Sequence, residues 1–177
     1  MSGRPALDPE LAELLASLPE FAPLSAETLP LRRPYASAPV EPLLATRDVV
    51  RREEVIAALD GSALPVTVIS PRPAGRAAPG VLWLHGGGMV MGDRFSQLDI
   101  PLEWLDALGA VVVSVDYRLA PEASGTTLVE DGFAALTWMA AHADEFGIDA
   151  DRLVVAGTSA GGGVAAGVVL LARDRSA

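Results

Sequence analysis

The sequence has 177 residues, a formal net charge of −10 and a hydrophobic content of 50%, so it is long enough and apolar enough for one domain with a proper core. The negative charge excludes nucleic acid and anionic membrane surfaces as partners, because both repel an acidic chain. Since there is no cysteine and the only histidines are His85 and His142, disulfides, thiolate metal sites and histidine-rich metal clusters are excluded, and we expect no bound metal.

The first 20 residues do not have the pattern of a secretory signal. Acidic side chains recur through their apolar stretch, whereas the central region of a signal peptide is a continuous apolar run. The longest apolar run, residues 161–172, is interrupted and too short to span a bilayer. We therefore expect a cytoplasmic protein with no membrane span.

Residues 1–44 are expected to form a cap or linking segment before the main domain. Asp8, Pro9 and Glu10 stand in the order of a helix N-cap, a proline at the first helical position and a first-turn acid. The apolar face of this helix comprises Leu11, Leu14, Leu15 and Leu18, before Pro19 ends it. Prolines then recur too often for long elements, although residues 25–31 favour another turn or two of helix. An arm that merely covers the sheet is the alternative interpretation.

The main domain begins with a predicted β-hairpin. Residues 47–59 and 64–70 flank the turn signal Asp60-Gly61 and are predicted to pair as antiparallel strands. Two continuous apolar runs follow, residues 81–84 and 111–115, and they have the composition of strands buried on both faces. The sheet is thus expected to continue with strands of the parallel type.

Helical patterns separate the later strands. Residues 94–108 carry apolar side chains at three- and four-residue spacing, with Pro101 marking a start or a kink and Gly109 the end. A second helix, residues 127–146, is predicted to open on a Thr-x-x-Glu capping box. Alternation of strands and helices implies right-handed crossovers and ligands beyond the carboxyl ends of the strands. The sequence therefore predicts an α/β fold: a mostly parallel sheet with helices on both faces, preceded by a short helical cap segment.

The stretch around which the prediction is organised is residues 153–163, L-V-V-A-G-T-S-A-G-G-G. A short apolar strand is followed by G-x-S-x-G and then by small residues that open a helix. A serine on such a tight strand-to-helix turn has strained backbone angles, and side chains larger than glycine two positions away would clash. Ser159 is therefore the candidate nucleophile, with its negative charge favoured by the N-terminus of the next helix. The alternative is a glycine-rich N-terminus of a closely packed helix.

Three motifs stand in a characteristic order: H-G-G-G at residues 85–88, D-Y-R-L-A-P-E at 116–122 and G-T-S-A-G-G at 157–162. Together they resemble the hormone-sensitive-lipase-like branch of the α/β-hydrolase fold, and the resemblance covers about residues 45–175. It implies a serine carboxylic ester hydrolase, of the esterase or lipase-like kind, that acts on small acyl esters and needs no cofactor.

The resemblance also implies roles for individual residues. Ser159 corresponds to the nucleophile, and the backbone N–H groups of Gly87, Gly88 and Ala160 correspond to the oxyanion hole, where preorganised donors stabilise the charge that develops on the carbonyl oxygen. His85 corresponds to a structural histidine that holds its loop in shape. The remaining assignments place Trp83 and Trp104 in the core and Met89, Val90 and Met91 along the acyl or alcohol site.

The sequence departs from the family pattern in three places. Thr158 stands where an acid often precedes the nucleophile, and Ala123 replaces the histidine that usually follows the Pro-Glu pair. The third departure concerns the catalytic triad, whose acid and histidine follow the nucleophile in this fold. Only eighteen residues follow Ser159, and they contain one acid, Asp174, and no histidine. His142 precedes the nucleophile and is interpreted as a partly exposed helix histidine.

These observations predict that residues 45–177 are the N-terminal part of an α/β-hydrolase domain, truncated after the nucleophile helix and inactive alone. The alternative is a truncated homologue that binds esters or other small ligands without turnover. A P-loop or dinucleotide binder is excluded, because Gly161-Gly162-Gly163 lacks both the Lys-Ser/Thr pair and the G-x-G-x-x-G spacing.

The family resemblance also predicts an exposed sheet edge. In the family's strand order, the strand at residues 153–156 lies between the strand ending at Leu84 and one that would follow Ala177. An apolar strand left at an edge invites the addition of another strand. We therefore expect the chain to associate with itself through this edge.

Overall fold

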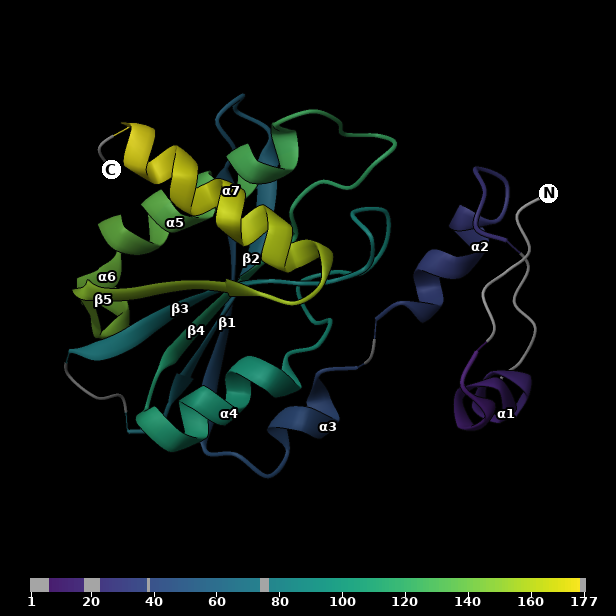
Figure 1. Cartoon of the computed structure of the whole chain (residues 1–177). Coiled ribbons are helices and arrows are strands. Elements are labelled where there is room, and N and C mark those ends of the chain that lie inside the picture. Colours follow the sequence, from purple (N-terminus) through teal and green to yellow (C-terminus); the bar gives the residue numbers. More distant parts are fainter. Residues whose placement is uncertain (1–6, 18–22, 38, 74–76, 176–177) are drawn as a thin grey trace.

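The computed structural model describes residues 7–17, 23–37, 39–73 and 77–175 and contains one five-stranded sheet (Figure 1). The strand order across the sheet is β1-β2-β4-β3-β5. The strands are β1 Val49–Ala57, β2 Ala63–Pro71, β3 Ala78–Leu84, β4 Val111–Val115 and β5 Ile148–Gly157. Each strand contains the apolar stretch that predicts it, because such stretches bury one or both faces when extended. β3 and β5 are longer than predicted, since they begin at Ala78 and Ile148 and not at residues 81 and 153.

Strand directions agree with a mostly parallel sheet. β1 and β2 form the predicted antiparallel hairpin, with Val49 opposite Pro71 and Ala57 opposite Ala63. β2 also runs antiparallel to β4, whereas β3 is parallel to both β4 and β5. Four strands therefore point the same way and only β2 is reversed, so the carboxyl ends of β3, β4 and β5 share one edge of the sheet.

Helices cover both faces of the sheet, as predicted. Figure 1 shows α4 (Asp99–Leu108) on one face and α5 (Thr127–Ala141) with α7 (Ala160–Arg175) on the other. The α4 side has an apolar core of Ile69, Trp83, Leu98, Leu102, Leu105 and Val112. The α5 and α7 side has a larger one, which includes Val66, Leu82, Leu84, Val113, Phe133, Val164 and Val168. β3 and β4 thus contribute side chains to both cores, one on each face of the sheet.

The N-terminal segment contains α1 (Pro9–Ser17), α2 (Leu29–Arg32), the 3₁₀ helix η1 (Arg33–Tyr35) and α3 (Glu41–Leu44). The Asp8 side chain caps α1 as predicted, accepting the Glu10 N–H at 2.9 Å. Leu11, Leu14 and Leu15 are all more than half exposed, and Figure 1 shows α1 away from the sheet. The predicted end of this helix at Leu18 and Pro19 lies outside the described residues. The domain boundary at residue 44 stays a prediction.

The helix predicted over residues 94–108 is shorter than expected, and Pro101 marks its start and not a kink. α4 begins at Asp99, which places Pro101 within its first turn, where a missing N–H costs no helical hydrogen bond. Gly109 ends the helix with φ +66°, as its position predicts. Residues 94–98 form turns that lead into α4.

The predicted capping box is wrong. The N-cap of α5 is Thr126, not Thr127, and no side chain caps the helix there. Thr126 has helical backbone angles, φ −85° and ψ −6°, whereas a capping residue needs extended ones. Its hydroxyl bonds the Glu130 carboxylate at 3.0 Å.

The predicted second helix is also interrupted. α5 ends at Ala141 and a short α6 (Ala143–Phe146) follows. His142, with φ −109° and ψ 15°, breaks the helix between them, and its Nδ1 lies 2.8 Å from the carbonyl oxygen of Trp138.

In the part of the chain that the structure describes, no helix has the length and apolarity needed to cross a membrane. The cytoplasmic location stays a prediction.

Candidate active site

The strand-turn-helix arrangement predicted around Ser159 is present. β5 ends at Gly157, α7 begins at Ala160, and Ser159 lies exposed between them. Its φ of +52° is in the left-handed region, which is uncommon for a residue with a side chain and marks local strain. The first hydrogen bonds of α7 run from Gly161 N–H to Thr158 and from Gly162 N–H to Ser159, at 2.8 and 3.0 Å. The serine is therefore held at the tip of the turn by the helix that follows it.

The flanking glycines are required by backbone contact between the turn and β3. A Cβ on Gly161 would lie 2.0 Å from the carbonyl oxygen of Leu84 and 2.4 Å from that of His85. A Cβ on Gly157 would lie 2.5 Å from the backbone of Gly161. All three distances are far below van der Waals contact, so only glycine lets the two strand ends lie this close together.

The H-G-G-G stretch forms a loop at the end of β3, directly beside the serine turn. The N–H groups of Val90 and Met91 both donate to the carbonyl oxygen of Gly87, at 3.2 and 3.1 Å, and close a tight turn. Gly87 and Gly88 have φ of +124° and +66°. A Cβ on Gly87 would lie 2.0 Å from the carbonyl oxygen of Met91, so a side chain there would open the turn.

Three backbone N–H groups of described residues, at this loop and at the start of α7, have no acceptor. Among the described residues, the N–H groups of Gly87 and Gly88 donate no hydrogen bond. Ala160 is the first residue of α7, and the first N–H groups of a helix have no partner within it. Gly86 and Thr158 mark where the two loops meet. Their backbones lie so close that a Cβ on Gly86 would be 3.2 Å from the carbonyl oxygen of Thr158. The three predicted donors thus come from two loops in contact.

His85 is an anchor for its loop. The ring is fully buried, stacks on Tyr117 with 4.3 Å between ring centroids, and has Nδ1 2.7 Å from the carbonyl oxygen of Gly86. Burial lowers the pKa of His85, so the ring is neutral and Nδ1 donates. Burial also raises the pKa of Tyr117 to about 12, so its hydroxyl stays protonated and donates to the His85 carbonyl oxygen at 2.6 Å. These contacts agree with the structural role predicted for His85.

His142 is far from Ser159. It precedes the amino end of β5, while Ser159 follows the carboxyl end; ten strand residues span about 30 Å. Its ring stacks on Trp138 at 4.9 Å between ring centroids. The side chain is partly exposed, as predicted, but the residue lies between two helices and not within one. Neither histidine forms a hydrogen bond with Ser159.

The aromatic and apolar residues divide between core and surface. Trp83 is buried and meets Trp104 edge to face at 6.2 Å between ring centroids, so both belong to the core, as predicted. Met89 is 39% exposed and reaches α7, where a Cβ on Gly163 would lie 3.8 Å from its Cε. Its thioether therefore lies beside the first turn of α7.

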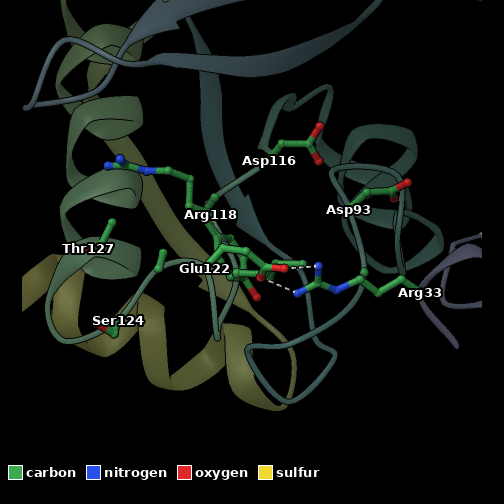
Figure 2. Close-up of a pocket in the computed structure, with 11 residues that line it drawn as sticks. Arg33, Asp93, Asp116, Arg118, Glu122, Ser124 and Thr127 are labelled. Carbon is green, nitrogen blue, oxygen red and sulfur yellow. Dashed lines mark hydrogen bonds and ion pairs between the residues drawn. The ribbon is translucent and has the colours of Figure 1, made fainter. Parts of the chain in front are cut away.

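The loop after β4 borders a hollow of about 640 Å³, drawn in Figure 2. Its lining includes Asp93, Asp116, Glu122 and Ser124, and none of the predicted site residues. Arg118 holds this loop: its backbone N–H and Nε each donate to Oδ2 of the buried Asp131 at 2.9 Å. No group of three or more metal-binding side chains occurs among the described residues.

Sequence reasoning missed two arginines that organise this region. Arg118 lies in the motif D-Y-R-L-A-P-E, which does not indicate its partner, and Asp131 is a buried acid within α5. Arg33 lies 57 residues before Val90 and 89 before Glu122, its partners in the structure. No local pattern marks such distant pairs.

A family model described as alpha/beta hydrolase fold matches residues 81–177. Among curated proteins, esterase LipI of Mycobacterium tuberculosis is 37% identical over 175 residues, which are 97% of this chain and 53% of the relative. Carboxylesterase NlhH of the same organism is 39% identical over 174 residues, with the same coverage. The chain spans about half the length of these relatives.

Solved structures give the same picture. A bacterial heroin esterase superposes with a TM-score of 0.81 at 40% identity, covering 98% of this chain and 55% of the other. An esterase of Pyrobaculum calidifontis superposes with a TM-score of 0.78 at 33% identity, covering 97% and 55%.

Proposed function

The chain belongs to the α/β-hydrolase family, and from that premise we propose that it serves carboxylic ester hydrolysis, with Ser159 as the nucleophile. The observation that carries this proposal is the left-handed backbone of Ser159, φ +52°, at an exposed turn between β5 and α7. Strain of this kind persists where the surrounding structure enforces it, and it concentrates at functional sites. The esterase names of the relatives agree with the proposed reaction.

In the proposed reaction, Ser159 Oγ attacks the ester carbonyl carbon and its proton passes to a base. The negative charge forms on the carbonyl oxygen, and the N–H groups of Gly87, Gly88 and Ala160 stabilise it from two loops already fixed in place. The partial positive charge at the N-terminus of α7 also stabilises this oxygen. Collapse of the intermediate breaks the bond to the alcohol, which leaves with a proton, and water then releases the acid from the serine. No cofactor takes part in these steps.

The substrate proposed for this site is a small acyl ester. Met89 lies exposed beside the start of α7, and Val90 and Met91 follow it in the same turn. Flexible thioethers adapt to apolar groups of varied shape, which suits a short acyl or alcohol chain.

Neither histidine of this chain is placed to act as the general base that accepts the Ser159 proton. His85 is buried against Tyr117 and His142 lies beyond the other end of β5. Comparable triads that lose their histidine keep about a thousandfold to ten-thousandfold acceleration over water. We therefore expect only residual turnover from the 177-residue chain.

Labelling with a fluorophosphonate ester tests the nucleophile. We expect slow phosphonylation of Ser159 alone, mapped by peptide mass spectrometry, and none in Ser159→Ala. Ser124→Ala is the matched control, because Ser124 lies on the nearby loop after β4 and should not change the rate. An adduct on Ser124 or Ser114 with Ser159 unmodified would contradict the assignment.

Substitution of Gly88 tests the oxyanion hole, and the same substitution at Gly109, which ends α4, is its control. Both have φ +66°, and neither would place a Cβ within 3.4 Å of another residue, so alanine strains both backbones alike. Alanine keeps the N–H group but adds a methyl group to the oxyanion loop and strains the backbone that directs the N–H. Because one oxyanion donor contributes roughly 100-fold or more to a rate, we expect Gly88→Ala to slow labelling of Ser159 by about tenfold or more and Gly109→Ala to leave the rate unchanged. Equal effects of the two would mean that Gly88 serves only the backbone conformation.

A second candidate function is ligand binding without turnover, favoured by the position of both histidines away from Ser159. Steady-state hydrolysis of a short-chain nitrophenyl ester by the chain, its Ser159→Ala variant and its His142→Ala variant separates the two. Residual turnover abolished by Ser159→Ala supports the hydrolase. Binding of an ester analogue with no labelling of Ser159 supports the binding protein, and turnover abolished by His142→Ala would contradict the position assigned to that histidine.

A further inference from the structure

Arg33 connects the N-terminal segment to the two loops beside the candidate site. It lies in η1, and its side chain is 29% exposed. Nε donates to the carbonyl oxygen of Val90 at 2.8 Å, and Nη2 donates to that of Ala120 at 2.9 Å. Nη1 and Nη2 also bind the two carboxylate oxygens of Glu122 at 2.8 and 2.7 Å (Figure 2). One guanidinium thus bridges three segments of the chain.

The two carbonyl groups belong to loops that already contact each other. Val90 is part of the turn closed by Gly87, whose N–H is a proposed oxyanion donor. The Ala120 N–H donates to the Met89 carbonyl oxygen at 2.8 Å. The bonds of Val90 and Met91 to Gly87 close the turn, and Arg33 ties it from outside to the loop that contains Ala120.

Glu122 orients the guanidinium. Its hydrogen bonds with Arg33 lower the pKa of Glu122 to about 2, so the carboxylate is ionised at neutral pH. The ion pair itself is exposed and adds little stability. The bonds from a charged donor to the two carbonyl oxygens are stronger than neutral ones, and the planar fork of arginine fixes their directions.

We propose that Arg33 is a positioning residue that holds the Gly87–Met91 turn in the conformation that presents the oxyanion donors to an ester. This role rests on the proposed function and adds a part for the N-terminal segment in it. Arg33 acts through the carbonyl oxygens of Val90 and Ala120 and does not touch the substrate. Displacing reacting groups by 1 Å can cost about 100-fold in rate, so losing the clamp should slow the reaction at Ser159.

The test measures the second-order rate of phosphonylation of Ser159 in the full 177-residue chain. We expect a fall of about tenfold or more in Arg33→Ala, within the range that misplacement produces. Arg33→Lys should restore little, because an ammonium cannot reproduce the fork. Glu122→Gln should have a smaller effect, since the carbonyl bonds remain. Arg47→Ala is the matched control: Arg47 lies just after the N-terminal segment and joins it to the main domain, because its guanidinium donates to the Leu43 carbonyl oxygen and pairs with Asp106.

Chemical rescue separates positioning from general stability. Removing the Arg33 side chain leaves space at the edge of the hollow beside Glu122, where a millimolar concentration of ethylguanidinium can bind. We expect ethylguanidinium, but not ethylammonium, to restore labelling of Arg33→Ala. Should Arg33→Ala not fold, Arg33→Lys gives the same comparison of rates.

Two results would overturn the role of Arg33 while the proposed function stands. One is labelling of Arg33→Ala and Arg33→Lys at the wild-type rate. The other is an equal loss in Arg33→Ala and Arg47→Ala with no selective rescue. A wild-type chain in which Ser159 is never labelled would instead overturn the proposed function, and the role of Arg33 with it.

Discussion

The two edges of the sheet differ in how they face their surroundings. β1 carries charged side chains at four consecutive positions, and three of them form ion pairs: Arg51 with Glu53, Arg52 with Glu145, and Glu53 with Arg94. β5, at the opposite edge (Figure 1), has Val154 49% exposed. Beside it on α7, Val169 and Leu170 are each 51% exposed.

The β1 edge is suited to contact with solvent, and the β5 edge is not. Charged side chains on an edge strand oppose the addition of another strand, and β1 has them. Residues 153–156 of β5 have the apolar composition of a strand buried on both faces, and an apolar hollow lies beside them, lined by Val155, Ala165, Val169 and Leu170 among others. The β5 edge therefore has the less suitable composition for contact with water.

The largest expected effect is at the β5 side, where backbone lies against backbone. Gly161→Ala would place a Cβ 2.0 Å from the Leu84 carbonyl oxygen, and we expect a loss of about 3 kcal/mol or more in the free energy of unfolding. Gly163→Ala, in the same helix with its nearest contact at 3.8 Å, should be neutral or stabilising by up to about 1 kcal/mol. Urea unfolding midpoints measure both, and similar values would mean that the turn can move away from β3.

The next prediction is that copies of the chain associate through β5, the edge strand, which among the described strands pairs only with β3. We expect the average mass of the chain in sedimentation equilibrium to rise with concentration, and Val154→Lys to shift it toward the monomer. Val55→Lys is the matched control, since Val55 is 70% exposed on β1. A wild-type monomer at high concentration, with amides protected along both sides of β5, would contradict this prediction.

The smallest effect is expected at β1. Burial raises the pKa of Glu53, but hydrogen bonds from Thr67 and Arg51 and the charges of Arg51 and Arg94 outweigh it and leave the pKa below its ordinary value. A pKa lowered by folding gives stability that is present above the unfolded value, about 4.3, and is lost as the pH falls through the folded value.

Because the Glu53 side chain is 42% exposed, solvent screening limits the loss in Glu53→Gln to about 1 kcal/mol or less at neutral pH. The difference from wild type should shrink as the pH falls below about 4. Glu54→Gln is the control at the next position. A difference that stays constant down to pH 2 would show that the charge of Glu53 is not the cause.

The sequence by itself determined the elements whose signals are local. The hairpin at Asp60-Gly61, the buried strands and the turn at Ser159 follow from apolar runs and from glycines at fixed spacing, since these features depend on residues close in the chain. The prediction of a capping box at Thr127 was wrong because the N-cap of α5 is one residue earlier, at Thr126, whose backbone angles are set by the loop that leads into the helix. Likewise, no residue at the break marks it in the sequence: His142 leaves helical angles at φ −109° and ψ 15°, although its N–H still donates to the Trp138 carbonyl oxygen.

Only the tertiary structure decided which distant groups meet. It paired Arg118 with the buried Asp131 and brought Arg33 to Val90 and Glu122. An arginine can pair with any acid or carbonyl group within reach, and periodicity fixes which face a residue occupies but not what lies opposite. Those partners are chosen by the path of the chain through space, which local patterns do not encode.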